Sequence, residues 1–252
     1  MIKKTFLIAL IIFLTTGTML CQDYNSATYR IVINKEKFSS SLDDRGVEIS
    51  LKKVFLNMIN VTNSTLFSLT FNDEVSMFQP IDQLSIGENN LKTNIAMLSL
   101  LNCEGNIYLD AKEKEYYIMR SLGSFKHLVK TEMQCLDWTI QEDKKIVNNI
   151  NYRKATAIIS NDDNSKLLNV EAWFCPSISV QYGPSTFYGL PGLITEVHIT
   201  PEDKSLFEYS LVMSNLENND TIDNIIIPLE TYKVYTEEES NALYREAVGK
   251  FN

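Results

Sequence analysis

Residues 189–199 have the sequence Gly-Leu-Pro-Gly-Leu-Ile-Thr-Glu-Val-His-Ile, a corner of glycine and proline followed by an alternating segment. Every second residue from Leu193 to Ile199 falls on one side of a two-residue repeat, with Glu196 and His198 on the other side. This repeat is typical of a β-strand that buries one face. The stretch therefore predicts a strand that begins directly after a sharp turn.

The corner itself has the composition of a tight turn. Pro191 fixes its own φ angle and disfavours helix at Leu190, while Gly189 and Gly192 can adopt positive φ. The leucines and the isoleucine of the segment would pack the turn onto a sheet. We therefore expect a folding corner that sets the register of the following hairpin.

The alternative interpretation of the corner is a recognition loop flanked by aromatic side chains. Exposed aromatic rings beside a rigid turn would favour this alternative. The residues of the candidate loop are Tyr182, Phe187, Tyr188, Gly189, Leu190, Pro191, Gly192, Leu193 and Ile194.

The two-residue repeat recurs along most of the chain. Strands are expected at 27–34, 67–71, 107–109, 116–119, 138–140, 155–159, 167–174, 193–199 and 207–211. Polar clusters separate them, with hairpin turns expected at 161–164 and 201–203. This succession predicts an α+β fold that is predominantly antiparallel β-sheet with a few helices.

Three segments have helical character. Apolar residues recur at helical spacing over 47–59, and the members of that face are Leu51, Val54, Phe55, Met58 and Ile59. The apolar run 91–101 suits a buried helix or a buried strand, and we expect a helix. Near the C-terminus, Thr236 and Glu239 form a capping box, which predicts an amphipathic helix with Leu243, Tyr244, Ala247, Val248 and Phe251 on one face.

The N-terminus has the pattern of a secretory signal. Lys3 and Lys4 precede an apolar run at 6–14 that is too short to span a bilayer comfortably. We expect a signal peptide at 1–21 and a single strand-rich domain at 22–252. After the signal, no apolar stretch approaches bilayer-spanning length, so no transmembrane segment is expected in the mature chain.

Net charge and cysteine content limit the functions and the disulfides that the sequence allows. The net charge is -9, and removal of the two leader lysines would make the chain more acidic still, which disfavours binding to nucleic acid. Export would permit one disulfide among Cys103, Cys135 and Cys175 and leave one thiol over. The sequence does not select the pair, and a buried unpaired cysteine is the simplest interpretation of any one of them.

Familiar catalytic motifs are absent from the sequence. The two histidines, His127 and His198, are expected on strands without metal-binding spacing, so neither a metal nor a cofactor is predicted. His198 shares a strand face with Glu196, and we expect a surface ion pair rather than a general base. The catalytic residues of a possible enzyme stay unknown.

A family resemblance rests on the corner and its flanks. Residues 189–194 spell GLPGLI, and the stretch 138–199, which includes Lys154-Ala155-Thr156, resembles the GLPGLI family of exported Bacteroidetes proteins. The resemblance implies export and bacterial origin, and because the family is functionally uncharacterised it implies no catalytic residues. Tyr152 and Cys175 stand where similar proteins often carry cysteine and threonine, so no family disulfide is carried over.

Two functions follow as hypotheses. The favoured one is an exported envelope protein in the periplasm, at the cell surface or outside, which binds an unknown protein or small ligand without catalysis. The alternative is an extracytoplasmic enzyme whose site is assembled from distant strands. A concave pocket with His127 or His198 beside a carboxylate would favour the enzyme, and an exposed aromatic patch on an acidic surface would favour binding.

We predict that the mature protein begins at or near Gln22 and carries no lipid. Leu20 occupies the position before Cys21 at which lipoprotein signals generally have a small residue. Intact-mass measurement of the exported product tests this expectation. A diacylglyceryl group on Cys21 would contradict it and would make the protein membrane-anchored.

Overall fold

The fold is known from a computed structural model, which describes residues 26–81, 105–133, 136–160, 167–202, 208–218 and 225–249. The expected signal peptide, the helix at 91–101 and the turn at 161–164 lie outside these ranges, as do Cys103 and Cys135. Within these ranges, no helix is long and apolar enough to cross a membrane.

The described residues form one sheet of twelve strands in the order β12-β6-β5-β4-β3-β2-β1-β11-β10-β9-β8-β7. The strands are β1 (Ser26–Val32), β2 (Leu66–Phe71), β3 (Val75–Pro80), β4 (Ile107–Asp110), β5 (Glu115–Leu122), β6 (Phe125–Glu132), β7 (Thr139–Val147), β8 (Ile150–Ser160), β9 (Leu167–Cys175), β10 (Leu193–Pro201), β11 (Tyr209–Glu217) and β12 (Val234–Thr236). Neighbouring strands pair antiparallel, except that β12 pairs parallel with β6. The α+β prediction is confirmed.

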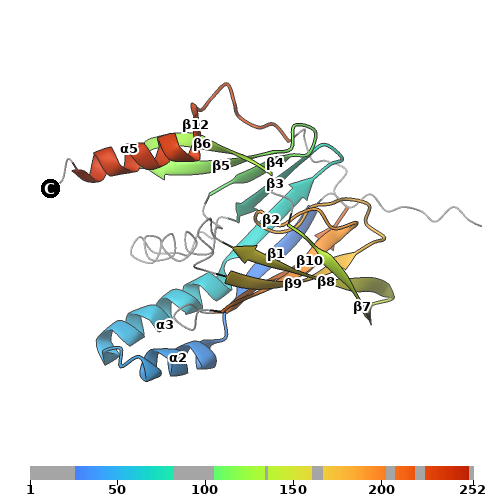
Figure 1. Cartoon of the computed structure of the whole chain (residues 1–252), viewed down its shortest axis with the longest axis horizontal. Coiled ribbons are helices and arrows are strands. Elements are labelled where there is room, and N and C mark those ends of the chain that lie inside the picture. The colour runs from blue at the N-terminus through green and yellow to red at the C-terminus, as the bar shows by residue number, and fades with distance from the viewer. Residues whose placement is uncertain are drawn as a thin grey trace, which may run out of the picture.

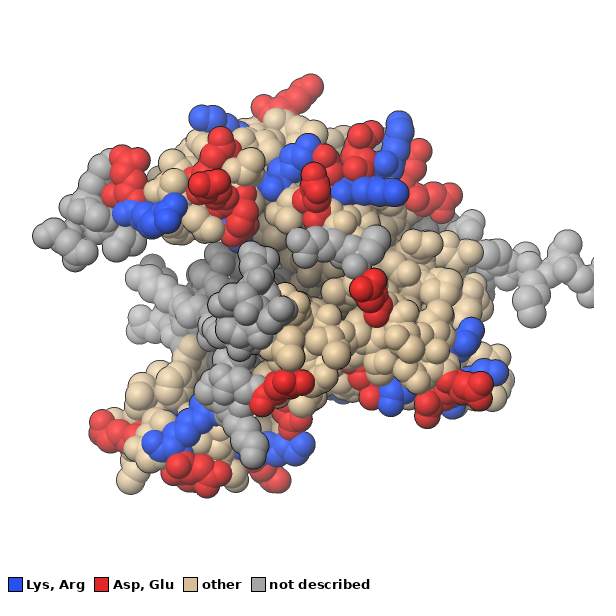
Figure 2. Space-filling model, viewed as in Figure 1, with Lys and Arg blue, Asp and Glu red and all other residues tan. Residues whose placement is uncertain are grey.

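The sheet twists so strongly that its ends form two arms in Figure 1. The first arm consists of β4, β5, β6 and β12, and the second arm consists of β7 to β10. Figure 2 shows most charged side chains toward the upper and lower edges of the molecule, with a largely uncharged surface between them in this view. The connection between β9 and β10, residues 176–192, contains no charged side chain.

Alternating aromatic and aliphatic residues explain the centre of the sheet. On β1 and β2, the paired residues Tyr29 and Phe67 point into the core, and both are fully buried. The Phe67 and Phe78 rings stack with centroids 5.1 Å apart, and Tyr29 meets Phe78 edge to face at 6.2 Å. Such rings supply large buried apolar areas, so this cluster anchors the middle of the sheet.

Three helices are described: α2 (Lys35–Asp44), α3 (Ile49–Ser64) and α5 (Glu237–Gly249). The helix expected at 47–59 is confirmed as α3, although it runs further. Its predicted buried face is partly wrong, because Leu51 and Val54 are 47% and 51% exposed. The start of α3 extends beyond the sheet (Figure 1), so Ile49, Leu51 and Val54 stay exposed, whereas Phe55 still packs against the core.

The expected ranges contained no segment for α2, β3, β6 or β12, although His127 of β6 was expected to lie on a strand. For α2 a signal was present, because the side chain of Asn34 accepts hydrogen bonds from the amides of Glu36 and Lys37 and caps the helix. The capping box of α5 is confirmed: the Thr236 amide donates to Glu239 at 2.8 Å, and the Glu239 amide donates to the Thr236 hydroxyl at 3.2 Å.

The connection 176–192 lies inside the curve of the sheet and contacts both arms. From the first arm, the Tyr116 ring packs edge to face on Tyr188 at 5.6 Å, and its hydroxyl donates to the Thr186 carbonyl. From the second arm, the Trp138 indole donates to the Tyr188 carbonyl at 2.9 Å. This connection therefore fills the core between the arms.

The corner at the end of this connection is a turn whose backbone geometry requires glycine. Gly189 and Gly192 have φ angles of 95° and 149°. A Cβ atom on Gly192 would lie 2.3 Å from the carbonyl oxygen of Cys175 and 2.8 Å from the Cα of Pro176. Only glycine allows the start of β10 to pass so close to the end of β9.

We predict that Gly192→Val destabilises the protein by about 3 kcal/mol or more, since the positive φ and the backbone collision both oppose a side chain. Gly46→Val is the matched control, because Gly46 also has a positive φ, of 64°, but has no atom within 4 Å of an added Cβ. Thermal melts should show the larger loss for Gly192→Val. Equal losses of stability in the two variants would show that the backbone collision at Gly192 does not contribute.

Candidate functional site

The predicted recognition loop is mostly interior. Gly189 and Pro191 are exposed, whereas the remaining members of the loop are buried. In particular, the rings of Tyr182, Phe187 and Tyr188 are 4%, 7% and 4% exposed. The corner therefore does not present the exposed aromatic surface that the recognition-loop interpretation requires.

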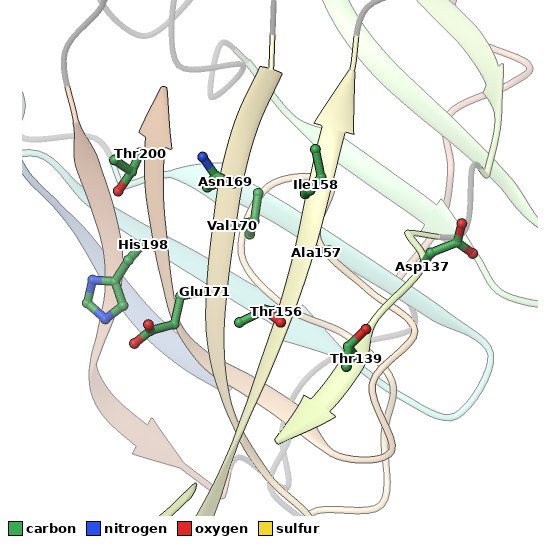
Figure 3. A pocket seen from close by; sticks show the side chains of 10 residues that line it. All are labelled: Asp137, Thr139, Thr156, Ala157, Ile158, Asn169, Val170, Glu171, His198 and Thr200. Atoms are coloured by element: carbon green, nitrogen blue, oxygen red, sulfur yellow. The ribbon is translucent and has the colours of Figure 1, made fainter. Parts of the chain in front are cut away.

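An open cleft of about 710 Å³ lies on the second arm, over the strands β7 to β10. Figure 3 shows its lining side chains spread over these four neighbouring strands. The lining residues are Asp137, Thr139, Thr156, Ala157, Ile158, Asn169, Val170, Glu171, His198 and Thr200. Most of these side chains are polar, so the cleft is suited to hydrogen bonding.

Strand register brings distant residues into one polar row. Thr139 pairs with Thr156, Thr156 with Glu171, Glu171 with His198, and His198 with Ser210. Residues directly opposite each other on neighbouring strands point to the same face of a sheet. The row therefore crosses five strands in a nearly straight line.

Two carboxylates beside the cleft are neutralised by lysines. The ammonium group of Lys154 lies 2.7 Å from Glu171, and the hydrogen bond to Glu171 raises the pKa of Lys154. The ammonium group of Lys145 lies 2.7 Å from Glu196 and 4.4 Å from the centre of the Trp173 ring. These pairs hold Glu171 and Glu196 in fixed positions.

His198 links Glu196 to Ser210. Its Nδ1 lies 2.8 Å from the Ser210 hydroxyl, and its Nε2 lies 3.5 Å from Glu196. The hydrogen bond to His198, followed by the contact with Lys145, lowers the pKa of Glu196 below its ordinary value. His198 does lie beside Glu196 on the same face of β10, but the contact with Ser210 could not be inferred without the strand register.

Other polar groups of the cleft keep their hydrogen-bonding capacity. No hydrogen bond joins the side chains of Asp137, Thr139, Asn169 or Thr200 to another described residue, and Ile158 is 62% exposed. The cleft thus combines uncommitted donors and acceptors with one apolar side chain.

The remaining predicted residues lie elsewhere. His127 is on β6 and is fully buried, far along the sheet order from the cleft. Cys175 is a buried free thiol. No group of three His, Cys, Asp or Glu side chains within the described ranges could hold a metal ion.

Comparisons with known proteins locate a family match in the same region. Residues 123–196 match the model of a family described as "Protein of unknown function (Porph_ging)". The match begins just before β6 and ends within β10, so it includes the corner and most of the cleft. No curated protein matches the chain.

Solved structures show similarity of fold. PNGF-II in a C2 crystal form is 9% identical over 86% of this chain and 32% of that chain, with a TM-score of 0.52. PNGF-II in a P21 form is 8% identical over 87% and 32%, also with a TM-score of 0.52. The chain therefore spans about a third of the length of PNGF-II. A LolA superfamily protein from Nitrosomonas europaea is 10% identical over 80% and 88%, with a TM-score of 0.31.

We predict that Lys145→Met moves the acid limb of the stability curve to higher pH. Because Glu196 has a lowered pKa in the folded state, its contribution is present above its ordinary value of 4.5 and is lost as the pH falls through the lowered value. Loss of the ammonium group should raise that pKa and cost about 0.5–1 kcal/mol near neutral pH. Urea unfolding as a function of pH measures both effects.

Lys37→Met is the control for this prediction. The Lys37 and Glu208 side chains form an ion pair while 68% and 40% exposed, so its removal should change the free energy of unfolding very little. An unchanged pH profile in Lys145→Met would contradict the role assigned to Lys145.

Proposed function

We propose that this chain is an exported bacterial envelope protein that binds a ligand without catalysis, and that the cleft over β7 to β10 is its binding site. The observation that carries the proposal is the set of uncommitted polar side chains around Ile158 in a cleft of about 710 Å³. Small-molecule sites generally have volumes in this range, with a few polar groups that orient the ligand.

Export and family are supported by the sequence. The Lys3-Lys4 leader pattern supports secretion, and the GLPGLI corner supports a relation to exported Bacteroidetes proteins. The Porph_ging match covers Thr156 on β8, Glu171 on β9 and Asp137 just before β7. The matched segment and the proposed site therefore coincide over most of the cleft.

The chemistry of the cleft indicates a polar ligand. Its two acidic side chains, Asp137 and Glu171, disfavour anions, and Glu171 is already paired with Lys154. The hydroxyl and amide groups of Thr139, Asn169 and Thr200 would exchange hydrogen bonds with a neutral or cationic partner. We therefore expect a small, uncharged or positively charged molecule rich in hydrogen-bonding groups, with an apolar part over Ile158.

A second candidate function, an enzyme, rests on the contacts of His198, because the cleft holds His198 beside a carboxylate, which is the arrangement expected to favour an enzyme. Ser210, His198 and Glu196 form a connected series like that of serine hydrolases, beside a cleft that also holds Glu171. Against it, the three groups lie on paired strands whose backbone amides are used by the sheet, and hydrolases need free donors for the developing oxyanion. A turnover that disappears in Ser210→Ala would establish this candidate.

We predict that Ile158→Arg weakens ligand retention at least about tenfold, because the long charged side chain would occupy the cleft. Native mass spectrometry of protein purified from envelope extract should show a small-molecule adduct in the wild type and not in this variant. Since Ile158 is exposed, the substitution should leave the fold intact.

Ile146→Arg is the matched control, because Ile146 is 70% exposed on β7 and does not line the cleft. It should retain the adduct at the wild-type level. Retention of the adduct in Ile158→Arg would place the binding site elsewhere, and the absence of any adduct from the wild-type protein would count against the proposal.

A further inference from the structure

The C-terminal helix α5 is attached to the first arm by a small set of polar contacts. Arg120 on β5 lies 2.9 Å from Glu237, and the Tyr244 hydroxyl donates to the Ser121 carbonyl at 2.8 Å. Leu243 is only half-buried, whereas Ser240 is completely buried. Attachment of this helix therefore depends strongly on what Ser240 contacts.

That contact is His127. The imidazole Nε2 lies 2.9 Å from the Ser240 hydroxyl, and the ring is completely inaccessible to solvent. It stacks on Phe125 at 5.4 Å and meets Tyr235 edge to face at 5.4 Å. The imidazole thus fills the space between β6, β12 and α5.

The second ring nitrogen of His127 is a buried polar atom of an unusual kind. Nδ1 has no hydrogen-bond partner among the described residues. In the neutral ring this atom can be an unprotonated acceptor, at modest cost. In the protonated ring it would carry a buried N–H without an acceptor, which is much more costly.

The charged neighbours of His127 also oppose a second positive charge. Arg120 is directly opposite His127 in the β5–β6 ladder, and the carboxylate of Glu237 on α5 is paired with Arg120. From the β12 side, the ammonium of Lys233 lies over the Tyr235 ring at 4.7 Å. The hydroxyl of Tyr244 on α5 is used by Ser121. Among the described residues, no ion pair or hydrogen bond joins a carboxylate to His127.

We propose that His127 makes the attachment of α5 sensitive to pH: the helix is held while the imidazole is neutral and is released when the imidazole is protonated. Release would expose the end of the β5–β6 hairpin and the half-buried face of α5 that includes Leu243, Tyr244 and Ala247. An exported protein would then present an additional apolar surface in acidic surroundings.

The direction of the effect follows from the pKa. Burial, and to a lesser extent Arg120, lowers the pKa of His127 in the folded state. A released histidine has an ordinary pKa of about 6.5. Attachment is therefore strongest above that value and weakens as the pH falls below it, until the lowered pKa is reached.

Hydrogen exchange of the full mature chain at about pH 7.5 and about pH 5.5 tests the proposal, because ordinary carboxylates stay ionised over this range. After correction for intrinsic rates, the amides of α5 should lose protection by up to about tenfold, because pH 5.5 lies about one unit below the ordinary pKa of a released histidine. The amides of β9 and β10 should keep theirs and serve as the internal reference. Equal protection of α5 at both pH values would overturn the proposal.

Two variants separate His127 from the other histidine. His127→Gln keeps a neutral side chain that can reach Ser240, so its α5 protection should not depend on pH. His198→Gln should behave as the wild type. The proposal fails if His127→Gln shows the same loss in acid as the wild type.

If His127→Gln does not fold, NMR titration of His198→Gln gives the answer, since His127 is then the only histidine of the chain. Its ring signals should titrate below the ordinary histidine range, together with the loss of α5 protection. An ordinary titration, or one that leaves the helix unchanged, would overturn the proposal.

Discussion

The fold depends on the insertion of an uncharged connection into the curve of a large sheet. Residues 176–192 cross between the two arms without a helix or a long strand of their own, so their backbone groups need partners inside the protein. Those partners are aromatic donors from the sheet: the Tyr116 hydroxyl and the Trp138 indole. Aromatic side chains thus provide both apolar volume and hydrogen bonds, and both are required to bury irregular backbone.

The strands and the corner could be predicted from the sequence because their causes are local. Alternation over β1 and β10 and the Gly-Leu-Pro-Gly turn depend on residues close together in the chain. The cleft could not be predicted, since Glu171 and His198 become neighbours only through the β9–β10 register. The exposure of Leu51 and Val54 is also non-local: spacing identifies an apolar helix face, but the extent of the sheet decides how much of it is covered.

The two faces of the second arm have different chemistry, and the alternation of the strands produces both. Ala172 and Val197 face the core, while their neighbours Glu171 and His198 lie on the side of the cleft. A substitution on the cleft side leaves the packing of the other side unchanged, because adjacent residues point in opposite directions. The sheet can therefore keep one fold while its outer row of side chains changes, which is a common basis of divergent binding in β-proteins.

The pairing of β1 with β11 has a consequence for how the protein is made. Ser26 is opposite Glu217, so the first strand acquires its second neighbour only when almost all of the chain is available. A sheet with such long-range pairing has a high contact order, and high contact order slows folding. Until synthesis is nearly complete, β1 can pair with β2 but not with β11. A chain of this topology closes its central sheet only after β11 has been synthesised.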